Sequence, residues 1–203
     1  MWIDPPEADA VLVLAHGAGS GMRTPFMAGF AEAIGRLGVA TMRFEFPYMR
    51  AGRKAPDRPP VLVEAWRAAF AEAAGRAGGR PVFAGGKSMG GRIASMAAAE
   101  GMPAAGLVFL GYPLHPPGRP DKIRDAHLDA VPAPMLFLQG TRDTFARPDL
   151  LAAVIARLGP RAEYRPVEGG DHSFRVPGGP RDAGVIAASL AEPAAAFMRR
   201  VAG

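Results

Sequence analysis

The sequence PVFAGGKSMGG, residues 81–91, organises the chain: a short apolar run leads into glycines around Ser88. An alanine-rich segment, residues 93–99, follows, so the order of residues predicts a strand, a sharp turn and a helix. Gly86 and Gly90 complete the pattern Gly-x-Ser-x-Gly, which is typical of a nucleophile elbow. A strand that turns directly into a helix brings the backbone on either side of the serine into close approach, and only glycine has no side chain to clash there. We expect Ser88 itself to have a strained backbone conformation.

Apolar runs alternate with helical patterns along the rest of the chain. Because βα alternation favours a parallel sheet covered on both faces, we predict a three-layer α/β fold with a mostly parallel central sheet. The 203 residues suffice for one well-buried core, so we expect residues 1–203 to form a single domain. The proline-rich connection 114–132 is too short for a folded lid, which predicts a minimal cap or none. Within this connection we expect a turn of helix near 121–125. The expected strands are 10–15, 39–46, 81–85, 105–110, 133–139 and 162–167. The expected helices are 25–37, 61–76, 93–99, 148–158 and 180–200, the last with a kink or restart at Pro193.

Three polar residues directly follow predicted strands, namely Ser88, Asp143 and His172. A serine hydroxyl needs a base to accept its proton, and the base needs an acid that orients it. The order Ser, Asp, His along the chain is that of the α/β-hydrolase fold. We therefore predict that Ser88 is the nucleophile, His172 the base and Asp143 the acid.

An attacked carbonyl oxygen needs hydrogen-bond donors that stabilise its developing negative charge. We expect one donor to be the backbone N–H of Met89, directly after the nucleophile. The second is expected from the loop after the first strand, with Ala18 preferred and Gly17 as the alternative.

Two of these motifs partly match nucleotide-binding patterns, and one further residue competes for the role of the acid. A phosphate-binding loop would need glycine where the chain has Pro81, and a dinucleotide fingerprint would need glycine at Met22. Asp171 is the nearest rival for the acid, but it is adjacent to His172 in the chain and badly placed to orient its ring.

The remaining histidines are given structural roles. His115 and His127 precede the Asp143 strand, which is the wrong order for the base. We expect His115 to line the mouth of the site. His16 is expected to hold the loop of the second donor rather than to act as a base.

Composition excludes several kinds of chemistry and partner. The chain has no cysteine, which removes disulfides and thiolate nucleophiles, and no cluster of histidines has metal-ligand spacing, so neither a metal nor a cofactor is implied. The net charge is +5, but the arginines are spread along the chain, which argues against a nucleic-acid partner. No signal peptide or membrane-spanning run is visible, so we expect a cytoplasmic protein with no membrane partner. The oligomeric state cannot be predicted.

The chain resembles the small α/β-hydrolases near the dienelactone-hydrolase group, and most closely the KANL3/Tex30-like branch. The resemblance implies an α/β-hydrolase core with a serine nucleophile and little or no cap. Dienelactone hydrolases proper use cysteine as the nucleophile, so their substrate is not carried over to this chain. Some relatives are subunits of larger complexes. The resembling stretches are residues 16–19, 44–48, 85–91, 111–115, 139–143 and 170–174.

The sequence thus predicts a serine hydrolase that cleaves small-molecule carboxylic esters or thioesters through an acyl-enzyme. The alternative is a catalytically weak protein of the same fold that serves as a binding or scaffold module. Three charged residues near the site have open roles. Lys87 is expected either to pair with Glu45 or to face solvent, and Arg142 and Arg23 would favour an acidic acyl group.

Overall fold

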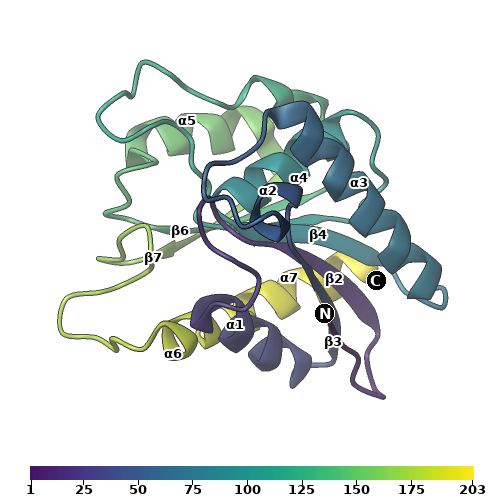
Figure 1. The fold of residues 1–203 in the computed structure, drawn as a ribbon. Helices are drawn as coiled ribbons and strands as arrows, with labels where there is room; N and C mark the ends of the chain where they lie inside the picture. The colour runs from purple at the N-terminus through teal and green to yellow at the C-terminus, as the bar shows by residue number, and fades with distance from the viewer.

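A seven-stranded sheet forms the centre of the computed structural model, which describes residues 1–203 (Figure 1). The strand order is β1-β3-β2-β4-β5-β6-β7, and every neighbouring pair is parallel except β1 with β3. The strands are β1 (Trp2–Ile3), β2 (Ala10–Ala15), β3 (Val39–Phe44), β4 (Val82–Lys87), β5 (Leu107–Leu110), β6 (Met135–Gly140) and β7 (Ala162–Val167). Because the six parallel strands all end at the same edge of the sheet, the residues that follow them collect there.

Helices cover both faces of the sheet and bury separate apolar clusters. On one face α1 (Pro25–Gly35), α6 (Ala183–Ala188) and α7 (Ala191–Ala202) pack over Leu12 and Leu14. On the other face α3 (Pro59–Arg76), α4 (Met89–Ala99) and α5 (Pro148–Leu158) pack over Val11 and Val13. Both faces of the central strands are therefore apolar, which explains why β2 is a continuous apolar run. The three-layer prediction is confirmed.

Several predicted boundaries were wrong. β1 was not predicted, because a two-residue strand carries no readable pattern. The strand expected at 39–46 ends at Phe44, since Pro47 opens a short helix α2 (Pro47–Arg50). The helical turn expected at 121–125 lies instead at η1 (Ala126–Ala130), and a second short 3₁₀ turn, η2 (Gly159–Arg161), follows α5. The last helix breaks between α6 and α7, and Pro193 lies in the first turn of α7, where proline is tolerated.

Helices α1 and α6 cross at a pair of glycines, one on each helix. A Cβ added to Gly29 would lie 2.6 Å from the Cα of Gly184. The two backbones therefore touch at this point, and any side chain on Gly29 would force the helices apart. This contact joins a helix near the start of the chain to one near its end.

The connection between β5 and β6 carries only the short helix η1 and builds no separate lid, as predicted. None of the helices combines the length and the apolar character that a membrane crossing needs.

Candidate functional site

Ser88 lies on a strained turn between β4 and α4. Its backbone has φ 52° and ψ −116°, and it is one of two non-glycine residues with positive φ. The two flanking glycines approach the end of β2: a Cβ on Gly86 would lie 2.4 Å, and one on Gly90 2.3 Å, from the carbonyl oxygen of Ala15. The elbow thus packs against a neighbouring strand as well as against itself. The prediction of a strained serine between obligatory glycines is confirmed.

Gly90→Ala is expected to destabilise the fold by about 3 kcal/mol or more, because the new methyl group would meet main-chain atoms that cannot move without separating β2 from β4. Chemical denaturation measures the change. Gly75→Ala is the matched control: no atom lies within 4 Å of its added Cβ, so this exposed position in α3 should gain up to about 0.5–1 kcal/mol. Equal stabilities for the two variants would contradict the packing argument.

The structure brings Ser88, His172 and Asp143 together at the carboxyl edge of the sheet. The Nε2 atom of His172 lies 2.8 Å from Oγ of Ser88, and its Nδ1 atom lies 2.6 Å from Oδ2 of Asp143. A carboxylate only accepts, so Nδ1 carries the ring proton and Nε2 is left to accept the serine proton. The three side chains, separated by up to 84 positions in the chain, form one unbroken hydrogen-bond relay.

The Asp143 carboxylate is buried, and its side chain has no exposed surface. Besides His172, its Oδ2 accepts from Nε2 of Gln139 at 2.6 Å, and its Oδ1 accepts from the backbone N–H of Phe145 at 2.8 Å. These donors satisfy the buried charge and fix its orientation. Gln139 is in turn held because its Oε1 accepts from the N–H of Tyr112 at 2.7 Å.

Sequence reasoning missed Gln139, which is in the stretch 139–143 but received no role. Its signal was a buried polar residue at the end of an apolar strand.

The imidazole of His172 is packed as well as hydrogen-bonded. The ring of Phe145 lies 4.2 Å from it between centroids, at an interplanar angle of 30°. The segment that carries Phe145 is tied down by His115, whose N–H donates to the Phe145 carbonyl and whose Nε2 accepts from the N–H of Arg147. His115 is 2 % exposed, so it does not line the mouth of the site, as had been expected, but anchors the segment behind His172.

The loop after β2 has its main chain fixed by His16 and Ser20. The Nδ1–H of His16 donates to the Gly17 carbonyl at 2.8 Å, and its Nε2 accepts from the N–H of Phe46 at 3.2 Å. Both the N–H and the hydroxyl of Ser20 donate to the same Gly17 carbonyl. His16 is fully buried and has both ring nitrogens occupied by main-chain groups, which fits the predicted structural role.

These contacts decide which way the next N–H points. In a trans peptide the N–H of Ala18 points opposite to the Gly17 carbonyl, which is held by His16 and Ser20. The Ala18 N–H has no acceptor within the protein. Met89 is the first residue of α4, so its N–H has no acceptor in the preceding turn of that helix. Both predicted donors therefore have the free N–H that the role requires.

Both expectations for Lys87 were wrong. Its Nζ donates to the His172 carbonyl at 2.6 Å, and the residue is neither paired with a carboxylate nor fully exposed. Burial of the ammonium lowers the pKa of Lys87 to about 8. Glu45 has a different partner, since its Oε1 accepts from the N–H of Met22.

The other rival residues lie outside the relay. Asp171 uses Oδ1 to accept from the N–H groups of Ser173 and Arg175, so it shapes the loop around His172 rather than orienting its ring. His127 lies 2.8 Å from Oγ of Ser95 in the packing between η1 and α4, and burial lowers its pKa to about 4.

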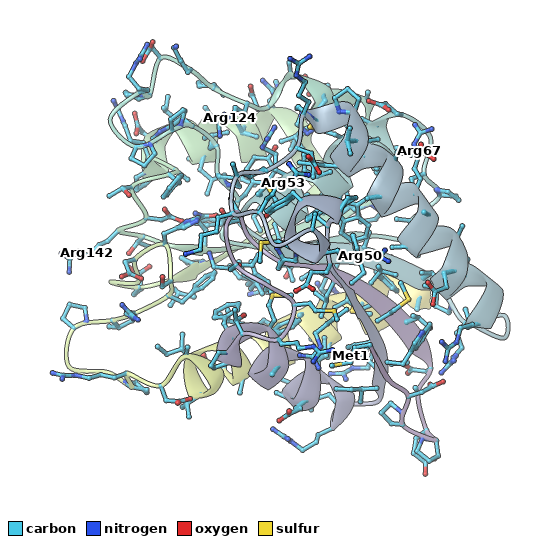
Figure 2. The ribbon with its side chains drawn as sticks, viewed as in Figure 1. Met1, Arg50, Arg53, Arg67, Arg124 and Arg142 are labelled. Atoms are coloured by element: carbon cyan, nitrogen blue, oxygen red, sulfur yellow. The ribbon has the colours of Figure 1, made fainter.

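Two cavities lie near this edge of the sheet, and neither is lined by Ser88 or His172. One of about 900 Å³ lies beside β3 and α3 and is lined by Met1 and Arg50, among others (Figure 2). The other, of about 630 Å³, is lined by Arg142, Arg175 and Arg181. Arg23 lines neither cavity, so the two arginines singled out from the sequence, Arg23 and Arg142, share no common pocket. The side chains contain no group of three or more histidines and carboxylates placed to hold a metal ion.

Comparison with known proteins adds a family and several solved structures. A family model described as "Alpha/beta hydrolase domain" matches residues 8–200. An alpha-beta serine hydrolase homologue from Coxiella burnetii is similar at a TM-score of 0.75 and 18% identity, with 97% of this chain and 89% of that chain covered. A dienelactone hydrolase from Anabaena variabilis is similar at a TM-score of 0.76 and 22% identity, with 98% of this chain and 89% of that chain covered. Est1E from Butyrivibrio proteoclasticus, solved with ferulic acid bound, is similar at a TM-score of 0.72 and 16% identity, with 98% of this chain and 93% of that chain covered. At these identities the solved structures show the shared fold.

Proposed function

Because the chain belongs to the alpha/beta hydrolase domain family, we propose that it is a serine hydrolase that cleaves carboxylic esters or thioesters through an acyl-enzyme. The observation that carries the proposal is the relay from Oγ of Ser88 through His172 to the buried carboxylate of Asp143. A relay of this kind turns a weak hydroxyl nucleophile into a reactive one. Esterases and serine hydrolases among the similar structures agree with this class of reaction.

In the acylation step, Oγ of Ser88 forms a bond to the carbonyl carbon while its proton passes to Nε2 of His172. Asp143 stabilises the imidazolium that results and keeps the ring in the required tautomer. The negative oxygen of the tetrahedral intermediate accepts from the N–H groups of Met89 and Ala18, and each such donor contributes about 10²–10³ in rate. The intermediate collapses when His172 returns the proton to the leaving alcohol or thiol.

In the deacylation step, water attacks the acyl-enzyme with His172 again as base, and the released acid restores Ser88. The mechanism needs no bound cofactor. The absence of a lid leaves the acyl group open to water and to substrates of small to medium size.

Labelling with a fluorophosphonate probe tests the proposal. The probe reacts with an activated serine, so the folded protein should be labelled and the adduct should lie on the peptide that contains Ser88. Prior denaturation is the control, because it separates Ser88 from His172 and should abolish the reaction. No labelling of the folded protein would contradict the proposal and favour the alternative, a binding or scaffold protein that keeps the fold without turnover.

Substrate charge is a separate prediction. Arg142, Arg175 and Arg181 line one cavity beside the His172 loop together with one carboxylate, that of Asp171, and none of the three arginines forms a salt bridge in the protein. We expect an ester that carries a carboxylate to be cleaved about 3- to 10-fold faster than its neutral analogue at low ionic strength, and added salt to reduce the difference. Initial rates on matched ester pairs measure this. Equal rates would remove the preference for an acidic acyl group.

The finer expectations from the sequence stay predictions: membership of the KANL3/Tex30-like branch, action of residues 1–203 as one domain, and a cytoplasmic location. A screen of ester chain lengths and thioesters addresses the preferred substrate directly.

A further inference from the structure

The Lys87 side chain links the nucleophile strand to the loop of the base. Lys87 is the last residue of β4 and directly precedes Ser88, and its Nζ donates to the carbonyl of His172 at 2.6 Å. This is the only hydrogen bond that the backbone of His172 makes within the protein. One side chain therefore connects the main chain beside the nucleophile to the main chain of the base, 85 positions later.

The groups in contact with the ammonium are uncharged, while the carboxylates of Asp143 and Asp171 attract its charge without bonding it directly. Nζ lies 5.9 Å from the ring centroid of Phe26 and 5.5 Å from that of Phe174. A Cβ added to Gly17 would lie 3.7 Å from Cγ of Lys87, so the lysine stem packs against this loop. A Cβ on Gly111 would lie 3.1 Å from Nζ and 3.6 Å from Nδ1 of His172. The ammonium thus shares the space above Gly111 with the ring of the base.

The buried ammonium of Lys87 does not stabilise the fold. Burial of an ammonium without a directly bonded carboxylate is unfavourable, and this desolvation outweighs the attraction of Asp143 and Asp171 for the charge. A neutral side chain at this place would avoid that cost. Strained or desolvated groups retained beside reacting atoms are typical of functional sites.

We propose that Lys87 is a positioning residue, which fixes the backbone of His172 so that Nε2 stays within hydrogen-bond distance of Ser88. The inference rests on the proposed function. The loop around His172 contains Gly169 and Gly170 and lacks regular secondary structure. Asp171 ties the neighbouring residues to one another, but the Lys87 bond is the only hydrogen bond that holds the main chain of His172 itself. Without the bond, the imidazole keeps Asp143 and Phe145 as partners but loses its fixed distance to the serine.

Two substitutions separate positioning from simple packing. Lys87→Met keeps the length and apolar stem but removes the donor, and Lys87→Arg keeps a charged donor. We expect Lys87→Met to lower kcat for a short-chain p-nitrophenyl ester, and the rate of fluorophosphonate labelling, by about 10- to 100-fold with KM unchanged. Lys87→Arg should recover most of that loss. Lys122→Met, at an exposed lysine in the connection before η1, is the matched control and should behave as the wild type.

The dependence of the rate on pH provides a readout that a merely structural role would not move. The groups facing the ammonium are Asp143 from the loop after β6, Asp171 and His172 from the loop after β7, and only uncharged residues from α1 and from the loops after β2 and β5. Since the pKa of Lys87 is about 8, loss of its proton weakens the bond to His172 above that pH. The labelling rate of the wild type should therefore fall across this range, while Lys87→Arg, which stays protonated, should show no such fall.

The outcomes distinguish the two proposals. A folded wild type that is not labelled at all overturns the proposed function, and the role of Lys87 with it. A wild type that is labelled, beside a Lys87→Met protein labelled at the same rate, overturns only the role of Lys87. If Lys87→Met does not fold, the pH profiles decide: a fall near pH 8 that persists in Lys87→Arg contradicts the inference.

Discussion

Ser88→Ala is expected to lower kcat for ester hydrolysis by about 10⁶-fold and to abolish fluorophosphonate labelling, because no other hydroxyl is within reach of Nε2 of His172. Steady-state kinetics and mass spectrometry of the labelled protein measure both effects. The fold should be unaffected, since alanine keeps the Cβ and the strained φ of 52°.

Two variants control this result. Ser173→Ala removes an exposed hydroxyl next to His172 that makes no hydrogen bond in the protein, and it should keep full activity. Ser88→Gly should be as inactive as Ser88→Ala but more stable by about 1 kcal/mol, because glycine adopts a positive φ without strain. Labelling that survives in Ser88→Ala would place the nucleophile elsewhere.

Asp143→Asn is expected to lower kcat by about 10⁴-fold. Both oxygens of this carboxylate act as acceptors: Oδ2 accepts from His172 and Gln139, and Oδ1 accepts from the N–H of Phe145. An amide group has only one acceptor oxygen, so the NH₂ faces either the N–H of Phe145 or both His172 and Gln139. If the NH₂ takes the Oδ2 position, His172 has to move its proton to Nε2, where it can no longer accept from Ser88. Unsatisfied buried donors should also reduce the free energy of unfolding by about 1–3 kcal/mol.

Asp171→Asn is the matched control, because this carboxylate is adjacent to His172 in the chain but hydrogen-bonds only within its own loop. Its kcat should change by no more than about 3-fold. Kinetics at constant pH and thermal denaturation of both variants separate the loss of catalysis from the loss of stability. Equal losses in the two variants would show that the acid was wrongly assigned.

The sheet and the relay could largely be predicted from the sequence because both depend on local patterns repeated in order. A continuous apolar run such as 10–15 has few structures open to it, and a polar residue after such a run falls at the carboxyl edge of the sheet. The elbow adds an independent constraint, since the glycines at 86 and 90 are required by main-chain contacts with Ala15. The helix expected at 25–37 begins at Pro25, where the Thr24 side chain accepts from the N–H of Met27.

Contacts between distant positions could not be predicted in this way. The bond from Lys87 to the His172 carbonyl depends on how far a flexible side chain reaches across the finished sheet. The orientation in which Gln139 donates to Asp143 is fixed by the N–H of Tyr112, 27 positions away, which donates to Oε1 of Gln139. The two-residue strand β1 is defined only by its partner, because Trp2 and Ile3 pair with Met42 and Thr41. In each case the partner, rather than the residue's own neighbours in sequence, determines the structure.

The contact of Gly29 with Gly184 has a consequence for synthesis of the chain on the ribosome. Strands β2 and β3 and helix α1 emerge early, but one side of their apolar cluster is completed only by α6 and α7. Until those helices have been synthesised, Leu12, Leu14 and Phe30 lack part of the apolar cover that they have in the folded protein. We therefore expect this half of the core to close only after α6 and α7 have been made, and a chain truncated before residue 183 to aggregate.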